Sequence, residues 1–325
     1  MLSAERGPLV PRRLCGLMAV VLVALVAGVA GCASANPTAS APAAASATAS
    51  ASPAATASYW PALNGINTKL AADIQQLRSA RTPTAVSAAA MTAEADVYLD
   101  FYRLVGMSPP SGLQAAQGAL VVALRNFRGA LTSTGSAADA GQVCTGPSAL
   151  EMLSSSAGAA QLRLAEAQLA NVDPTPGGSF LPAATPYTHR RLADGALVKR
   201  AARSGLGQLT VRNNNDQDAV VSLVRGGSDV AAMALYVRAR SSATTTGVAD
   251  GTYQVYYTTG ADWDGSQHLF TRYCDFEKLN KAIDFTTTPQ SSGATGYTTE
   301  QITLNPVFGG NVTASRVPAD KFPVS

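Results

Sequence analysis

The chain has 325 residues, of which 46% are hydrophobic, 6% are aromatic and 14% are charged, and its formal net charge is +3. That length accommodates about two domains, and the few aromatic residues require a core built mostly from small and aliphatic side chains. A net charge so close to zero argues against a dedicated nucleic-acid-binding protein, because such a protein needs a basic surface to neutralise phosphates.

Residues 1–31 have the layout of a secretory signal peptide. Arg6, Arg12 and Arg13 form a basic segment, and an apolar stretch from Leu14 to Val29 follows it. An uncleaved transmembrane helix is the alternative, for which this apolar stretch is barely long enough. Removal of the leader takes away three arginines and one glutamate and lowers the net charge from +3 to +1.

The tetrapeptide Val29-Ala30-Gly31-Cys32 ends the apolar stretch. It resembles the bacterial lipobox, whose cysteine receives a diacylglycerol group and becomes the first residue of the mature protein. Acyl chains such as palmitate anchor a protein by ~0.8 kcal/mol per buried CH₂ group, and so replace the apolar leader as the anchor. We therefore expect a lipoprotein held at the extracytoplasmic face of the cell membrane through Cys32.

Residues 32–58 are predicted to be a disordered tether. After Cys32 this segment consists almost entirely of Ala, Ser, Thr and Pro, without a charged or a large apolar side chain. Such a composition cannot bury enough surface to offset the conformational entropy lost on folding. We expect the tether to hold the folded part away from the membrane.

Residues 59–170 are predicted to form an antiparallel helical bundle of about four helices. Apolar residues recur there at steps of three and four, which is the spacing of one helix face. Thr82 and Pro83 are typical of a helix start, and Ser148 with Glu151 fits a capping box. The predicted helices are residues 59–81, 83–104, 112–131 and 148–170.

The second predicted helix carries Glu94, Asp96, Asp100 and Tyr102, which invites a metal-binding interpretation. Di-metal bundles need Glu-x-x-His pairs on facing helices, and residues 59–170 contain no histidine. A solvated helix face is the favoured interpretation.

Residues 171–206 are predicted to be a linker rich in Pro and Gly between two domains. A basic cluster follows the prolines. It could meet anionic headgroups or wall polymers, although a plain connector is the favoured interpretation. The cluster consists of His189, Arg190, Arg191, Lys199, Arg200 and Arg203.

Residues 207–325 are predicted to form an antiparallel, immunoglobulin-like β-sandwich. The apolar period drops to two, and turn signals such as Gly226-Gly227 and Asp250-Gly251 separate the short apolar runs. The fold class is therefore α+β with separate domains. The predicted strands are Leu209–Val211, Ala219–Val224, Ala234–Arg238, Tyr253–Tyr257 and Gln301–Leu304.

The segments Val237–Ala243, Gly251–Gly260, Asp262–Asp264, Phe270–Phe276 and Thr303–Gly310 resemble a domain that recurs in actinobacterial secreted and membrane-attached proteins. The resemblance covers roughly residues 207–323. It implies a β fold in an exported protein, and it implies neither a reaction nor catalytic residues. The Gly-Thr-Tyr sequence that starts the second segment is also similar to carboxypeptidase-regulatory-type sandwiches, which are generally non-catalytic.

Asp262, Trp263 and Asp264 form the most conspicuous polar group of the β region. Alternate carboxylates before a glycine resemble the opening of a calcium loop, but Tyr273 occupies the position where that loop needs a glutamate. We favour aspartates that cap a turn. Trp263, together with Tyr256 and Tyr257, could instead stack against sugars.

His189 and His268 are the only histidines. A Ser-His-Asp triad of His268, Asp264 and a serine is conceivable, but the chain has no Gly-x-Ser-x-Gly elbow. Cys144 and Cys274, the two cysteines that remain after lipidation, cannot build a four-ligand zinc site alone. We predict no metal and no cofactor.

An even pair of cysteines in an exported protein suggests a disulfide between Cys144 and Cys274. Such a bridge would join the loop before the fourth predicted helix to the β region. Two free buried thiols are the alternative.

The sequence favours a non-catalytic surface lipoprotein that serves as a binding or structural module of the cell envelope. Its predicted partners are the membrane, through the lipid anchor, and a cell-wall polymer or another envelope protein. An envelope-modifying hydrolase with an unrecognised site is the alternative. An enzyme should gather polar groups of perturbed pKa in one cleft, whereas a binding module should expose an aromatic or apolar patch.

Overall fold

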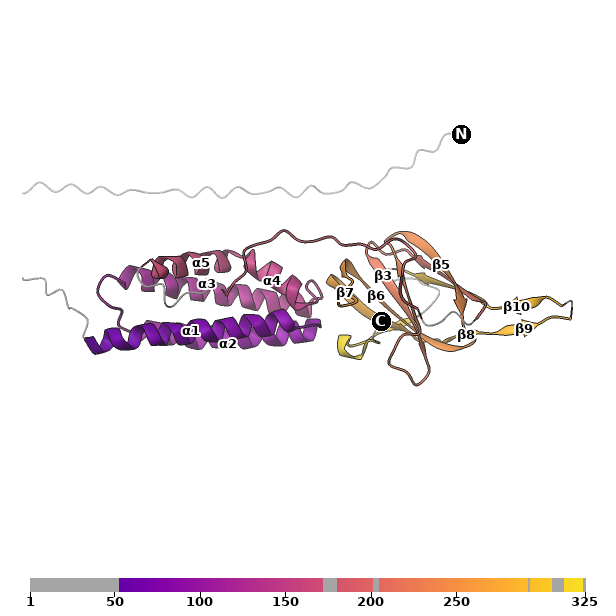
Figure 1. Ribbon diagram of the computed structural model, residues 1–325, viewed down its shortest axis with the longest axis horizontal. Helices are drawn as coiled ribbons and strands as arrows, with labels where there is room; N and C mark the ends of the chain where they lie inside the picture. Colours follow the sequence, from indigo (N-terminus) through magenta and orange to yellow (C-terminus); the bar gives the residue numbers. More distant parts are fainter. Residues whose placement is uncertain (1–52, 172–179, 201–204, 292, 306–312, 324–325) are drawn as a thin grey trace, which may run out of the picture. The chain divides into compact units, whose positions relative to one another are not determined.

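The computed structural model describes residues 53–171, 180–200, 205–291, 293–305 and 313–323. A helical region comes first and a region of β-strands follows it, so the fold is α+β with separate parts (Figure 1). The predicted signal peptide, Cys32 and most of the predicted tether lie outside the described residues. No helix in the described ranges is long and apolar enough to cross a membrane.

The helical region contains five described helices, where about four were predicted. The fourth predicted helix is divided at Ser155 and Ser156, and the Ser156 hydroxyl caps the new helix by accepting a hydrogen bond from the Ala159 backbone. Serine favours such a cap over a helix interior, because its side chain competes for backbone groups. The helices are α1 (Pro53–Ser79), α2 (Pro83–Val105), α3 (Gln114–Asp139), α4 (Gly146–Ser154) and α5 (Ala157–Ala170).

Several of the predicted helix boundaries differ from the structure. The third helix was predicted to end at residue 131, but α3 continues to Asp139. Helix α1 begins at Pro53, within the segment predicted as a tether. The capping box of α4 pairs Thr145 with Ser148, one turn before the predicted Ser148 and Glu151. The start of α2 is confirmed, because Thr82 accepts a hydrogen bond from the Ala85 backbone N–H.

One hydrophobic core holds the helices together. Helix α2 packs on α1 and α3, α3 packs on α5, and α4 packs on α1. The glycine at position 158 permits the contact of α5 with α3, because a Cβ atom there would lie 2.5 Å from the Asn126 carbonyl oxygen. The predicted core face of α1 is confirmed, since all of its members are buried: Leu63, Ile66, Leu70, Ile74 and Leu77.

The β region contains a seven-stranded sheet of order β1-β4-β3-β6-β7-β12, with β8 paired to β6, and two smaller sheets of order β11-β2-β5 and β10-β9. All five predicted strands are present, as β2, β3, β4, β6 and β11. Their bounds and those of the others are β1 Leu197–Arg200, β2 Gly207–Asn213, β3 Asp218–Arg225, β4 Met233–Val237, β5 Ser241–Val248, β6 Gly251–Asp264, β7 Leu269–Leu279, β8 Ile283–Phe285, β9 Thr287–Pro289, β10 Thr295–Tyr297, β11 Thr299–Leu304 and β12 Ala314–Arg316.

Antiparallel pairing was predicted for the whole β region, but one pair of strands is parallel. Strand β11 runs parallel to β2, with Thr299 opposite Gln208 and Leu304 opposite Asn213. The other ladders in the described part of the chain are antiparallel. A parallel pair needs a long connection, and here almost the whole β region lies between the two strands.

The central strands of the large sheet are buried on both faces. On one face, side chains of β3 and β6 share a core with Leu209 and Val211 of β2 and with Ile302 of β11. On the other face, Val220, Ala234, Tyr236, Trp263 and Phe270 form a second core. This double burial explains why β3 reads as a continuous apolar run.

The second core is covered by residues 187–196, which we call the strap. Its backbone pairs with the sheet, since Tyr236 donates to the Ala196 oxygen at 2.8 Å and Trp263 donates to the Arg190 oxygen at 2.9 Å. Strand β1 follows directly and pairs with β4. The second half of the predicted linker is therefore part of the β region.

Candidate functional site

The predicted candidates Asp262, Trp263, Asp264 and His268 lie together at the hairpin between β6 and β7. The first three end β6 and His268 lies in the turn. Asp262 and His268 both adopt positive φ angles, of 60° and 55°. Such angles are uncommon for residues other than glycine. Asp262 follows a register shift between β6 and β7 at Thr259 to Ala261, and His268 ends the hairpin turn.

The Asp262 carboxylate is buried and binds Arg190 of the strap. Its Oδ1 accepts from the Arg190 backbone at 2.8 Å and from Nε at 3.0 Å, while Oδ2 accepts from Nη2 at 2.7 Å and from the Thr271 hydroxyl at 2.7 Å. Burial alone would raise the pKa of Asp262. The hydrogen bonds from Arg190 and Thr271 outweigh that effect and hold the pKa well below its usual range.

Asp264 caps the hairpin turn, as the favoured interpretation predicted. Its Oδ1 accepts from the Ser266 backbone at 2.9 Å and from the Ser266 hydroxyl at 2.6 Å. Its Oδ2 lies 3.2 Å from Nη1 of Arg190. Both aspartates thus bind one guanidinium group. Among the described residues, no group of three or more His, Cys, Asp and Glu side chains is arranged to hold a metal ion.

Trp263 does not offer a sugar-stacking surface, and that interpretation is wrong. Only 2% of the residue is exposed. Its ring packs edge-on against Phe270 at 5.0 Å and against Tyr236 at 6.0 Å. Trp263 is a core residue of the face that the strap covers.

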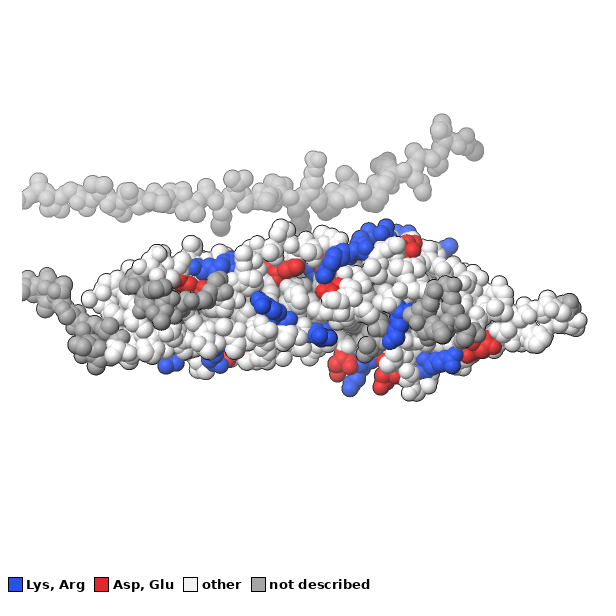
Figure 2. Space-filling model, in the orientation of Figure 1, with Lys and Arg blue, Asp and Glu red and all other residues white. Residues whose placement is uncertain are grey.

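A second ion pair fixes the next residue of the strap. Arg191 Nε donates to Asp218 Oδ2 at 2.7 Å, and Asp218 also accepts from the Tyr236 hydroxyl and from the Ala239 backbone at 2.8 Å. These bonds outweigh burial and lower the pKa of Asp218. Arg190 and Arg191 are therefore compensated, which weakens the hypothesis of a basic cluster for anionic surfaces. On the face shown in Figure 2, basic and acidic side chains lie side by side.

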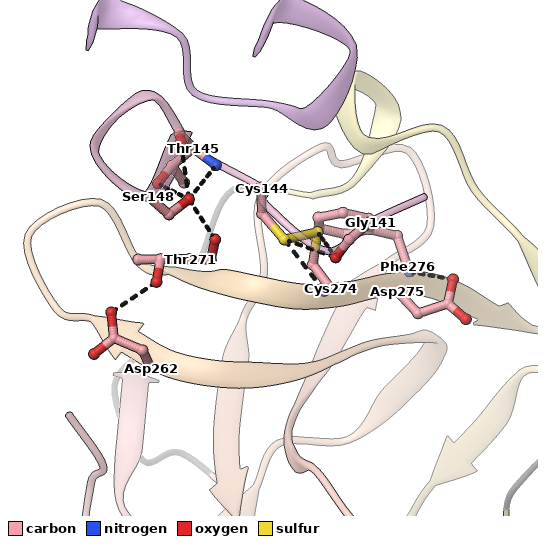
Figure 3. The surroundings of a disulfide bond; sticks show 9 residues. All are labelled: Gly141, Cys144, Thr145, Ser148, Asp262, Thr271, Cys274, Asp275 and Phe276. Atoms are coloured by element: carbon pink, nitrogen blue, oxygen red, sulfur yellow. Dashed lines mark hydrogen bonds between the residues drawn. A yellow bond between two sulfur atoms is a disulfide. The ribbon is translucent and has the colours of Figure 1, made fainter. Parts of the chain in front are cut away.

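Cys144 and Cys274 form a disulfide that joins the loop before α4 to β7 (Figure 3). Backbone hydrogen bonds flank it, from Cys144 to the Thr271 oxygen and from Cys274 to the Gly141 oxygen, each at 2.9 Å. The Ser148 hydroxyl donates to the same Thr271 oxygen at 2.6 Å. Gly141 has a φ of +69°, and a Cβ atom there would lie 2.7 Å from the Cys274 oxygen.

Arg272 links this junction to the strap. It forms an isolated β-bridge with Val143, its guanidinium donates to the Thr188 oxygen, and it lies 4.5 Å from the centre of the Tyr187 ring. The junction thus combines a covalent bond, backbone pairing and a cation–π contact. These contacts connect the helical region to β7 and to the strap.

An open cavity of about 490 Å³ lies beside the disulfide. Its lining includes Gln217, Tyr273, Cys274, Asp275 and Arg316, of which the last two approach to 3.4 Å. No histidine lines it. Its lining also includes a second carboxylate, that of Asp139, besides that of Asp275.

Among the acidic residues of α2, Glu94 lies apart from Asp96 and Asp100, and Asp100 is not solvated as predicted. Glu94 pairs with Arg128 of α3, whereas Asp96 pairs with Lys69 of α1. Asp100 is only 6% exposed. It is buried near Asp73 of α1, whose pKa is raised to about 6 by burial and by nearby carboxylates.

Helix α2 also exposes an apolar stripe that faces away from the helical core. We call it the α2 stripe, and its Tyr98 and Tyr102 rings pack edge to face at 4.8 Å. Two arginines of α3 lie beside it, with Arg128 over the Tyr98 ring at 4.6 Å and Arg125 over the Phe101 ring at 5.3 Å. The stripe consists of Met91, Tyr98, Leu99, Tyr102 and Val105.

Sequence reasoning missed both the strap and the α2 stripe. The ion pair of Arg190 with Asp262 spans 72 residues, and no local pattern reports such a contact. The stripe did leave a signal. Steps of seven, four and three residues separate Met91, Tyr98, Tyr102 and Val105. This spacing indicates a second apolar face of the helix, distinct from the buried face that contains Val97 and Leu104.

Comparison with protein-family models, with curated proteins and with solved structures gives no match.

Proposed function

We propose that this chain is a lipid-anchored protein of the cell surface whose folded part is a non-catalytic binding or structural module of the envelope. The lipobox at Val29–Cys32 supports the anchor. The observation that supports the non-catalytic role best is that the candidate carboxylates are engaged in structural ion pairs. The candidate carboxylates Asp262 and Asp264 both bind Arg190 and fasten the strap.

We also propose that the helices form a bundle and that the strands form a two-layered sandwich. The single core shared by the helices supports the first, and the core shared by β2, β11 and the large sheet supports the second. The immunoglobulin-like outline stays a prediction. In an immunoglobulin sheet, strands A and B, which follow one another in the chain, are neighbours. Here β2 has β11 and β5 as its neighbours, and neither is adjacent to β2 in the chain.

Incubation of the purified mature chain with isolated cell envelopes tests the proposed function. The protein carries Cys32→Ala, so that lipid does not contribute. We expect it to sediment with the envelopes and to release no soluble sugar or peptide from them. Release of such fragments would favour the hydrolase alternative, and a protein that stays in the supernatant would contradict a binding role.

A further inference from the structure

We propose that the α2 stripe docks the helical region on the surface of an anionic lipid bilayer. The inference deepens the proposed function by assigning a membrane-binding face to the folded part. It rests on the lipid anchor only for bringing that face near a membrane. The affinity of the stripe for lipid is a property of the described residues.

The exposure of the stripe is the first argument. Its residues are exposed to 66% at Met91, 62% at Leu99, 56% at Tyr102, 54% at Val105 and 40% at Tyr98. Exposed aliphatic side chains next to tyrosines match the boundary between headgroups and acyl chains, where aromatic rings place an apolar body and a polar tip. A stripe one helix wide suits shallow insertion into that boundary.

The charges beside the stripe are the second argument. Arg125 of α3 and Arg103 of α2 form no salt bridge within the described part of the chain. Arg128 is compensated by Glu94, and Asp96 is compensated by Lys69. Arg103 lies near the buried Asp100, whereas Arg125 adds a positive charge beside the stripe that complements anionic headgroups.

The position of the stripe along the chain is the third argument. Lys69 pairs with Asp96, and position 65 lies against Arg103, so α1 and α2 run antiparallel. The end of α2 that holds Tyr98 to Val105 is therefore the end nearest to Pro53, where α1 begins. Twenty residues, 33–52, separate Pro53 from Cys32.

The short connection to Cys32 favours a membrane over a soluble partner. If these residues form the disordered tether predicted from the sequence, their root-mean-square span is ~25 Å. Lipid on Cys32 would thus hold the stripe at a high effective concentration at the bilayer, where a face of modest affinity is sufficient. A protein partner, whose interfaces also favour Tyr and Arg, is the competing outcome of the test.

Flotation with lipid vesicles tests the proposal. The mature chain with Cys32→Ala is mixed with phosphatidylglycerol vesicles or with phosphatidylcholine vesicles at low salt. We expect flotation with the anionic vesicles and weaker flotation with the neutral ones. Leu99→Asp with Tyr102→Asp should lower the bound fraction about tenfold, because two apolar side chains are lost and two negative charges are added.

One control variant matches those two substitutions. Leu164 of α5 is 65% exposed and Tyr297 of β10 is 51% exposed, and neither belongs to the stripe. Leu164→Asp with Tyr297→Asp should float like the parent chain. Circular dichroism of each variant verifies that it is folded, and Arg125→Gln, which keeps the stripe intact, should weaken flotation with anionic vesicles alone.

Absence of flotation of the parent chain, or equal loss in the control, would overturn the docking proposal. So would stripe variants that lose binding to an envelope protein while vesicle binding is unchanged. Failure of the proposed function looks different. In that case Cys32 would carry no lipid in cells, while the purified chain would still float with anionic vesicles.

Discussion

Asp262 and Asp218 are buried carboxylates that each bind an arginine of the strap. Side-chain exposure falls to 2% for Asp262 and 7% for Asp218, whereas their arginines remain about half exposed. Loss of one partner from a pair of this kind leaves the other without its hydrogen bonds. These pairs therefore fasten the strap over the second core of the large sheet.

Asp262→Asn should lower the free energy of unfolding by about 2 kcal/mol, because the charge-assisted bonds to Arg190 are lost. Urea unfolding at pH 7 measures the effect. Asp216→Asn is the matched control, since Asp216 pairs with Arg240 at a surface position where 82% of the carboxylate is exposed. That control should change stability by less than about 0.5 kcal/mol. An equal loss of stability in the two variants would show that the pair of Asp262 with Arg190 contributes no more than an exposed ion pair.

At the scale of elements, the α1–α2 pair should respond to pH in the opposite sense to the strap. The pKa of Asp73 is raised to about 6 in the folded protein, from an ordinary value of 3.8. Folding therefore favours the protonated form. This contribution to stability is complete below pH 3.8 and is lost as the pH rises through about 6. The pKa values of Asp262 and Asp218 are lowered, so their contribution is lost as the pH falls below about 4.

Asp73→Asn should flatten the pH dependence of stability between pH 4 and 7 and should make the protein more stable at pH 8 than the parent chain. The amide keeps the shape of the side chain but cannot ionise among Asp96 and Asp100. Urea unfolding across this pH range, followed by the helical circular dichroism signal, measures the free energy of unfolding at each pH. A variant with the same slope as the parent would show that Asp73 is solvated.

The contact between α3 and α5 depends on Gly158. Gly158→Ala should destabilise the protein by about 2 kcal/mol or more, because the new Cβ atom would lie 2.9 Å from the Phe127 Cα atom and closer still to the Asn126 oxygen. Gly118→Ala in α3 is the control, since no atom lies within 4 Å of a Cβ there. That change should stabilise the protein by about 0.5 to 1 kcal/mol. Thermal unfolding should therefore shift in opposite directions, and two shifts of the same sign would refute the contact.

The spacing of apolar residues predicted those helices and strands that bury one face or both faces. The apolar steps of α1 and the continuous run of β3 are direct consequences of packing. Strand β5 was missed because its Ser and Thr residues alternate with few large apolar ones, and β7 was missed because most of its middle is polar. The strap was missed because its pairing depends on residues far apart in the chain.

At the scale of the whole molecule, the helical and β regions meet at the bridge between Cys144 and Cys274. The two cysteines are 130 positions apart, so the bridge closes a long loop. The loss of loop entropy in the unfolded chain makes such a bridge worth several kcal/mol. The candidate site residues of the hairpin and the two cysteines were visible in the sequence, but the use of Asp262 as a partner of Arg190 was not.

Cys144→Ser with Cys274→Ser should lower the free energy of unfolding by about 3 to 5 kcal/mol relative to the oxidised parent chain. Reduction of the parent chain should have a similar effect. Thiol labelling of the denatured, unreduced Cys32→Ala chain should find no free thiol among residues 33–325. Two labelled sites would contradict the bridge, and unchanged stability would contradict its role.

The central claim is that Cys32 is the lipid-bearing first residue of the mature protein. Mass spectrometry of the N-terminal peptide, from protein extracted from the membranes of its own host, tests it most directly. The account predicts a peptide that begins at Cys32 and carries the mass of a diacylglycerol group, and it predicts that Cys32→Ala abolishes this species while the two regions still fold. An unmodified Cys32 within an uncleaved leader would contradict it.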